Sequence, residues 1–126
     1  MREQKFRKLS IWHKAMELIE TVYKTTKSFP KEELYGLTNQ VRRAAVSIAM
    51  NIAEGSGADS DTEFKRFLII ALRSAYELMC GIELSVKLEY ITEKKGDEIL
   101  NQLEELSAMI TGFTKRLKAD RCQLKV

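Results

Sequence analysis

The chain has 126 residues and a formal net charge of +3, with 44% hydrophobic and 31% charged residues. These values exclude a disordered chain, and the length is that of a single domain with a core of its own. Two cysteines do not make a disulfide framework, no apolar run reaches the roughly 18 residues that a membrane span requires, and the basic N-terminus has no apolar signal segment. We therefore expect one cytoplasmic domain over residues 1–126, including basic tails at 1–9 and 119–126, with no membrane partner.

The first two predicted elements are amphipathic helices joined by a short turn. Apolar residues spaced three and four apart predict a helix from about Ser10 to Lys27. The segment SFP at 28–30 ends this helix, because a residue before proline is disfavoured in the helical conformation. A second helix is predicted from about Glu33 to Glu54, and Gly55 is expected to end it as a left-handed cap.

Two longer helices follow. The third opens with SDTE at 60–63, a capping-box pattern in which serine and glutamate side chains satisfy free backbone amides, and it continues to about Leu88. The fourth runs from about Glu93 to Ala119, with apolar residues at alternating spacings of four and three that indicate packing against neighbouring helices. Four helices with short connections predict an all-α fold, an antiparallel up-down-up-down four-helix bundle.

The charge is unevenly distributed along this bundle. Residues 1–14 and 115–126 each contain five bases and one acid, whereas the stretch between them contains 11 bases and 16 acids. In an up-down-up-down bundle both basic ends should meet at one pole, together with the 55–60 turn, whose acidic neighbours should partly offset them. The candidate nucleic-acid-binding residues are the bases of the two ends, with an exposed Arg42 as a second contributor: Arg2, Lys5, Arg7, Lys8, Arg42, Lys115, Arg116, Lys118 and Arg121.

The predicted helix at 33–54 carries a narrow polar stripe beside an apolar one. Its polar residues, at spacings of three and four, fall on one side of a helical wheel. The stripe is either a solvated face or a partly buried hydrogen-bonded network, within one subunit or between subunits, and Glu77 is a candidate partner for an arginine here. We assign a packing or assembly role to this set: Gln40, Arg43, Ser47, Asn51, Glu54 and Glu77.

No constellation of residues points to catalysis. His13 is the only histidine, which excludes the two Glu-x-x-His pairs of a di-iron bundle. Glu17 and Glu20 have a spacing compatible with magnesium ligands, but solvated acidic faces have the same spacing. Cys80 lies in an apolar run and is expected to be an inert core thiol. We therefore expect a protein that is not an enzyme, with no catalytic residues, no metal and no cofactor.

Two segments carry a family resemblance: FPKEELYGLTNQVRRAAVSIAMNIAEGSG at 29–57 and EFKRFLIIALRSAYEL at 63–78. They resemble the four-helix-bundle proteins encoded by intervening sequences in bacterial 23S rRNA genes, and the resemblance extends from about Leu9 to Leu117. It implies a ring-like homo-oligomer such as a pentamer, and a similarity to the accessory protein of diversity-generating retroelements, which binds nucleic acid and a reverse transcriptase. The chain departs from the family pattern at Arg73, where glycine is usual, and at Met79, where glutamate is usual.

Two functions are open at this point. The first is a homo-oligomer that binds nucleic acid, with RNA favoured over DNA, because several copies would multiply a pole that is only modestly basic in one subunit. The second is a protein–protein scaffold or structural oligomer with no nucleic-acid role, because terminal lysines and arginines are also common as solubility features.

Overall fold

A computed structural model describes residues 4–117, and every regular element in that range is helical. The 3-10 helices are η1 (Lys5–Lys8) and η2 (Lys31–Glu33), which precede the first and second long helices. The predicted all-α four-helix bundle is confirmed. Of the two predicted tails, residues 5–8 form η1, and the C-terminal tail lies outside the described residues. The long helices are α1 (Ser10–Thr26), α2 (Leu37–Ser56), α3 (Asp61–Lys87) and α4 (Glu93–Arg116).

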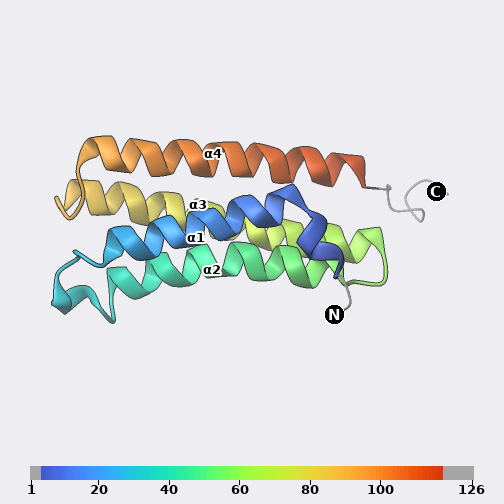
Figure 1. Cartoon of the computed structure of the whole chain (residues 1–126), viewed down its shortest axis with the longest axis horizontal. Coiled ribbons are helices and arrows are strands. Elements are labelled where there is room, and N and C mark those ends of the chain that lie inside the picture. Colours follow the sequence, from blue (N-terminus) through green and yellow to red (C-terminus); the bar gives the residue numbers. More distant parts are fainter. Residues whose placement is uncertain (1–3, 118–126) are drawn as a thin grey trace.

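Consecutive helices run in opposite directions (Figure 1). Contacts join α1 to α2, α2 to α3, α3 to α4 and α4 to α1, and the contact between α2 and α3 is the most extensive. The start of α1, the α2–α3 turn and the end of α4 therefore lie at one end of the bundle, while the α1–α2 and α3–α4 connections lie at the other. None of the helices in the described range combines the length and hydropathy that a bilayer span requires.

The start of α2 differs from the sequence prediction. Residues 31–33 form η2, and α2 begins at Leu37 instead of Glu33. The reason is local, because the Glu33 carboxylate accepts a hydrogen bond from the Leu37 amide at 3.0 Å and so caps a helix that starts after the turn. Sequence periodicity continues through this turn, so it could not reveal the break.

The prediction that Gly55 is a left-handed cap is also wrong. Gly55 is helical and buried, α2 continues to Ser56, and no glycine in residues 4–117 has a positive φ. A β-carbon on Gly55 would lie 2.7 Å from Phe67 Cβ and 2.9 Å from Phe64 Cδ1. This glycine therefore serves close packing, because it lets the end of α2 approach the first turn of α3.

Side-chain caps define where α3 and α4 begin. The Ser60 hydroxyl accepts a hydrogen bond from the Glu63 amide at 3.1 Å, which confirms the predicted start of the third helix. Thr92 does the same for α4, accepting from the Lys95 amide at 3.1 Å. In both helices, the hydroxyl of the residue before the first turn thus accepts a hydrogen bond from a backbone amide that would otherwise be free.

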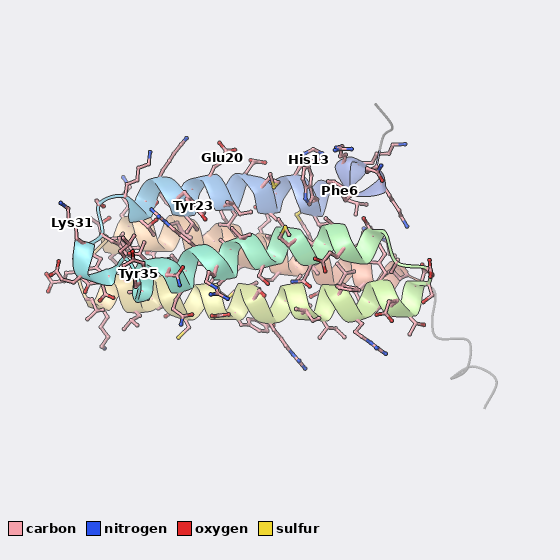
Figure 2. The ribbon with its side chains drawn as sticks, turned by 90° about the horizontal axis from the view of Figure 1, so that it is seen from below. Phe6, His13, Glu20, Tyr23, Lys31 and Tyr35 are labelled. Carbon is pink, nitrogen blue, oxygen red and sulfur yellow. The ribbon has the colours of Figure 1, made fainter. Side chains whose placement is uncertain are left out.

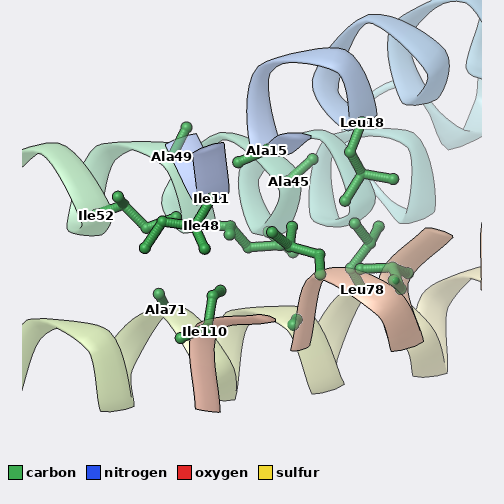
Figure 3. Packing of buried hydrophobic residues seen from close by; sticks show 14 of the residues in the cluster. Ile11, Ala15, Leu18, Ala45, Ile48, Ala49, Ile52, Ala71, Leu78 and Ile110 are labelled. Carbon is green, nitrogen blue, oxygen red and sulfur yellow. The ribbon is translucent and has the colours of Figure 1, made fainter. Parts of the chain in front are cut away.

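The core fills the space between the four helices (Figure 3). Small residues are buried on both helices of the most extensive contact, among them Ala45 and Ala49 of α2 and Ala71 and Ala75 of α3. Large aliphatic side chains supply most of the buried apolar surface, each stabilising the fold by about 1.5–3 kcal/mol. The largest fully buried side chains are Leu18, Val22, Ile48, Ile52, Phe64, Leu68, Leu78, Ile82, Ile99, Leu103, Leu106 and Ile110.

Candidate nucleic-acid interface

The end of the bundle where α1 begins carries an excess of basic side chains, and we call it the basic pole. Within residues 4–8, 54–66 and 113–117 it holds seven bases and four acids. The acids are Glu54, Asp59, Asp61 and Glu63, around the α2–α3 turn as predicted. The bases come from three segments: Lys5, Arg7 and Lys8 of η1, Lys65 and Arg66 of α3, and Lys115 and Arg116 of α4.

Phe64 is the point at which these three segments meet. The Lys5 ammonium lies 5.3 Å from the centroid of its ring, and the Phe113 ring of α4 lies 5.4 Å away. The Arg116 guanidinium lies 5.8 Å from the Phe113 ring in turn. The predicted meeting of the two chain ends at one pole is thus confirmed for the described residues, with cations held over aromatic faces.

A small aromatic cluster holds η1 against the start of α1. The rings of Phe6 and Trp12 meet edge to face, with centroids 4.9 Å apart. The Nε2–H of His13 donates to the backbone oxygen of Arg7 at 2.6 Å. Figure 2 shows Phe6 and His13 together at this end of α1. These contacts fix the backbone that carries Lys5, Arg7 and Lys8, and they give the lone histidine a structural role.

Lys65 and Arg66 are bases of the pole that the sequence analysis did not include. Arg66 is paired with Glu63 at 3.8 Å, and its side chain is 70% exposed. A surface pair of this kind contributes little to stability, which leaves the guanidinium accessible to a ligand. The topology that places the 55–60 turn at this pole also places the first turn of α3 there, so the signal was present in the sequence.

The predicted exposure of Arg42 is wrong. Arg42 is half-buried on the α1 side of α2, where its Nε–H donates to the Thr26 hydroxyl at 2.8 Å. Its guanidinium carbon lies 4.7 Å from the centroid of the Tyr23 ring. The side chain points into the groove between two packed helices, which a helical wheel of α2 alone does not reveal. Arg42 therefore joins α2 to the last turns of α1, away from the basic pole.

Three further candidates, Arg2, Lys118 and Arg121, lie outside the described residues. In the sequence they directly precede η1 or follow α4, so their formal charges add to a chain region that is already basic. The described candidates at the pole are Lys5, Arg7, Lys8, Lys115 and Arg116, of which all but the half-buried Arg7 are exposed.

The polar stripe of α2 divides into a hydrogen-bonded centre and solvated ends. The hydroxyls of Ser47 and Ser74 lie 2.8 Å apart and join α2 to α3. The Asn51 side-chain amide donates to the Ser47 backbone oxygen at 2.8 Å and to its hydroxyl at 3.0 Å. Gln40, Arg43 and Glu54 are exposed. Both alternatives drawn from the sequence therefore hold, each for part of the stripe.

Arg43 and Glu77 lie on the same side of the molecule. They line one surface groove between α2 and α3, with Asn39, Gln40, Ala44 and Ser47. No ion pair joins the two within residues 4–117, where the ion pairs include Lys14–Glu105, Arg66–Glu63 and Lys95–Glu98. Arg43 and Glu77 are thus neighbours in one groove, but the predicted ion pair between them is not formed.

Cys80 and possible metal ligands are the remaining reactive groups considered from the sequence. Cys80 was expected in the core, but it is an exposed free thiol on the outer side of α3, next to Tyr76 and Leu84. The apolar run that contains it covers the whole circumference of the helix, so sequence alone could not orient it. Across the described range, no group of three or more His, Cys, Asp and Glu side chains is arranged to hold a metal ion.

The opposite end of the bundle is electrically mixed. Residues 24–36 and 86–98 hold six bases and six acids.

At this end of the bundle the Tyr90 hydroxyl donates to the Glu33 carboxylate at 2.8 Å. The hydrogen bond from the Leu37 amide, followed by that from Tyr90, lowers the pKa of Glu33. The same bond to Glu33 is the main reason why the pKa of Tyr90 is raised.

These features define an all-α four-helix bundle with a basic pole. The chain belongs to the 23S rRNA-intervening sequence protein family, whose model matches residues 7–112. The resemblance drawn from the sequence is therefore confirmed.

A solved structure with similarity to this chain is a protein of unknown function from the S23 ribosomal protein family of Bacteroides thetaiotaomicron, determined at 1.70 Å resolution. It is 28% identical in sequence, superposes with a TM-score of 0.75, and the match covers 83% of this chain and 98% of that one. No curated protein sequence has significant similarity to the chain.

Proposed function

We propose that this protein is a non-enzymatic, homo-oligomeric helical bundle of the cytoplasm that binds nucleic acid, RNA in preference to DNA, through its basic pole. The observation that supports the proposal is the gathering of bases from η1, α3 and α4 around Phe64. The preference for RNA is supported by the family, whose description refers to the 23S rRNA intervening sequence.

The proposed binding is electrostatic. Lysine and arginine side chains neutralise phosphates and release counterions, so the affinity should fall steeply with salt and depend little on sequence. In one subunit the pole has seven bases against four acids. An oligomer that displays several copies of the pole on one surface would raise the apparent affinity without any new kind of contact.

A matched pair of variants tests the proposal. The pole variant carries Gln at Lys5, Lys8, Lys115 and Arg116, and the control variant carries Gln at Lys24, Lys27, Lys31 and Lys94. All eight side chains are exposed, and both variants lose the same formal charge. Binding is measured by fluorescence anisotropy at low salt with a fluorescein-labelled mixed-sequence single-stranded RNA, the DNA of the same sequence and a DNA duplex.

We expect the wild-type protein and the control variant to bind RNA with similar affinity, and the pole variant to bind at least about tenfold more weakly with a shallower salt dependence. A wild-type protein that binds none of the three probes at low salt would overturn the proposal. Equal losses in both variants would show that the net charge matters and the pole does not. Tighter binding to either DNA probe would overturn the preference for RNA.

A second candidate function is a protein–protein scaffold or structural oligomer. It is favoured by a different observation, the exposure of large hydrophobic side chains on α1, α2 and α3, such as Met50 at 54% and Tyr76 at 62%. Where exposed hydrophobic side chains form a contiguous patch, they mark a protein contact. Light scattering with and without nucleic acid separates the candidates, because a scaffold would be oligomeric alone and its mass would not change on addition of RNA.

A further inference from the structure

Phenylalanine and tryptophan side chains are unevenly distributed along the bundle. The chain has five phenylalanines and one tryptophan. Of these six residues, only Phe29 belongs to the α1–α2 connection at the mixed end. The others belong to η1, the first turn of α1, the first two turns of α3 and the last turns of α4: Phe6, Trp12, Phe64, Phe67 and Phe113. The end of the bundle that gathers bases therefore also gathers aromatic rings.

Phe6 is the ring of this group that the core explains least. Phe64 is 2% exposed and belongs to the core, and the half-buried Trp12 and Phe113 pack against it. Phe6 is also half-buried, but it lies outside the core, and η1 contains no buried residue. The Phe6 ring therefore keeps part of its apolar surface open to solvent, where a ligand can reach it.

Phe6, Trp12 and His13 are in contact in series, and we call them the aromatic cluster. The ring planes of Phe6 and Trp12 meet at 66°, and those of Trp12 and His13 meet at 74° with centroids 5.1 Å apart. An edge-to-face contact covers a face of only one of its two rings, so the cluster leaves ring faces that its own members do not cover. The Arg7 guanidinium carbon lies 5.1 Å from the centroid of the Phe6 ring, which adds a planar cation to the same surface.

The chain segment that carries the aromatic cluster is cationic and has no acidic residue. Residues 4–16 contain four bases, Lys5, Arg7, Lys8 and Lys14, and the first acid after them is Glu17. In η1 a phenylalanine stands directly between a lysine and an arginine. A nucleic-acid strand whose phosphates contact these bases would therefore bring its nucleobases next to an aromatic ring.

We propose that the basic pole takes RNA in single-stranded form and that unpaired nucleobases stack on the aromatic cluster, with Phe6 as the outermost ring, while Lys5, Arg7 and Lys8 contact the phosphates. Aromatic rings beside a positively charged surface are how proteins hold single strands without reading their sequence. The inference rests on the proposed function and deepens it, because it names the form of the RNA and a contact that is not electrostatic.

Charge alone and stacking predict opposite preferences. A duplex carries the phosphates of two strands, so a purely electrostatic site binds it at least as tightly as a single strand of the same length. The bases of a duplex are paired and stacked on one another, so they are not available to a protein ring. A site that stacks bases therefore prefers the single strand.

The test compares four unlabelled probes of equal length: a mixed-sequence single-stranded RNA, its RNA duplex, the single-stranded DNA of the same sequence and an abasic DNA strand built of tetrahydrofuran units. Competition against the fluorescein-labelled RNA at low salt gives the affinities. Trp12 is the only tryptophan of the chain, so its fluorescence reports on the aromatic cluster, because a stacked base quenches an indole.

We expect the wild-type protein to bind single-stranded RNA more tightly than the RNA duplex. The single-stranded DNA should bind at least about fivefold more tightly than the abasic strand, which has the same phosphates and no bases. Both single strands with bases should quench Trp12, and the abasic strand should leave its emission unchanged.

A matched pair of variants assigns the stacking to the aromatic cluster. Phe6→Leu keeps an apolar side chain and removes the ring, and it should bind single-stranded RNA at least about fivefold more weakly. Its affinity for the abasic strand and its salt dependence should equal those of the wild type. The control is Tyr35→Leu, which removes a 90% exposed ring at the opposite end of the bundle and should change neither affinity (Figure 2).

The abasic strand separates stacking from a structural role of Phe6. A Phe6→Leu variant that loses the same factor for the RNA and for the abasic strand would show that Phe6 only positions the bases of η1, and this would overturn the stacking. An RNA duplex that binds as tightly as the single strand, an abasic strand that binds as tightly as the DNA, or a bound single strand that does not quench Trp12 would overturn it too. These results leave the electrostatic binding intact, whereas a wild-type protein that binds no probe refutes the proposed function and the stacking together.

Discussion

Gly81 of α3 packs directly against Val41 of α2, so closely that a β-carbon on Gly81 would lie 2.5 Å from Val41 Cγ1. The helices that meet here share the most extensive contact of the bundle and carry the Ser47–Ser74 hydrogen bond. Steric separation at this point would disturb both the core and the outer groove that Ser47 and Glu77 line. The core and the outer groove thus both depend on the close approach of α2 and α3.

The first prediction is that Gly81→Ala destabilises the protein although alanine favours helices. Relief of the clash requires α2 and α3 to shift, which costs about 1–3 kcal/mol. The matched control is Gly112→Ala in α4, where an added β-carbon meets nothing within 4 Å; it should stabilise the helix by up to about 1 kcal/mol. Urea unfolding at one fixed protein concentration measures both changes, and equal stabilisation by the two substitutions would contradict the prediction.

The second prediction concerns the link between α1 and α2. Arg42→Lys removes the hydrogen bond from Nε to Thr26 and the planar stacking on Tyr23, and we expect a loss of about 1–2 kcal/mol in the free energy of unfolding. The next residue supplies the control, because Arg43 is exposed and makes no ion pair within the described residues. Arg43→Lys should change stability by less than about 0.5 kcal/mol. Similar losses in both variants would indicate that Arg42 does not join the two helices in solution.

Sequence reasoning was sufficient for the architecture because the signals there are redundant. Periodicity, a proline after α1 and the serine cap of α3 all point to the same four helices. Sequence reasoning failed to predict features that depend on how two helices pack together. Gly55 has the sequence context of a helix end, but it lies within α2, and its missing β-carbon makes room for the side chains of Phe64 and Phe67, which come later in the chain.

The same limit applies to the candidate sites. A wheel of α2 places Arg42 opposite the polar stripe, but only the position of α1 shows that Thr26 and Tyr23 engage it. Cys80 sits in a run of apolar residues that exceeds what the core can bury, so part of that run had to face outwards. The convergence of charge at the basic pole was predictable, because it follows from topology alone and does not depend on side-chain packing.

The third prediction is a dependence of stability on acid pH at the mixed end of the bundle. Hydrogen bonds from Leu37 and Tyr90 lower the pKa of Glu33 below its ordinary value of 4.5. Because the folded state holds the carboxylate charged, this stabilisation is present above the pKa of the unfolded chain and is lost as the pH falls through the lowered value. The free energy of unfolding of the wild-type protein should therefore decrease more steeply in acid than that of Glu33→Gln.

The acid dependence of Tyr90→Phe should lie between those of the wild type and Glu33→Gln, because the Leu37 amide still stabilises the charged carboxylate. Glu32→Gln is the matched control on the neighbouring exposed residue, and its acid profile should follow the wild type. Urea midpoints between neutral and acid pH measure all four proteins. Parallel curves for the wild type and Glu33→Gln would refute the role of this carboxylate.

The fourth prediction concerns the end of α3, which is formed by a residue other than glycine in the left-handed region. Glu89 has φ of 63°, its amide bonds to the Val86 oxygen at 2.9 Å, and the Tyr90 amide bonds to the Ser85 oxygen at 2.9 Å. This pattern is a Schellman motif. Its left-handed position favours glycine, because steric crowding of a β-carbon there costs about 1–2 kcal/mol. Glu89→Gly should therefore raise the free energy of unfolding by up to about 1 kcal/mol, because the greater freedom of glycine in the unfolded chain offsets the rest of this gain. Glu83→Gly, at an exposed position inside α3, should lower it by about 1 kcal/mol. Thermal and urea unfolding of the two glycine variants should give changes of opposite sign, whereas a loss of stability in both would mean that Glu89 does not hold the left-handed conformation in solution.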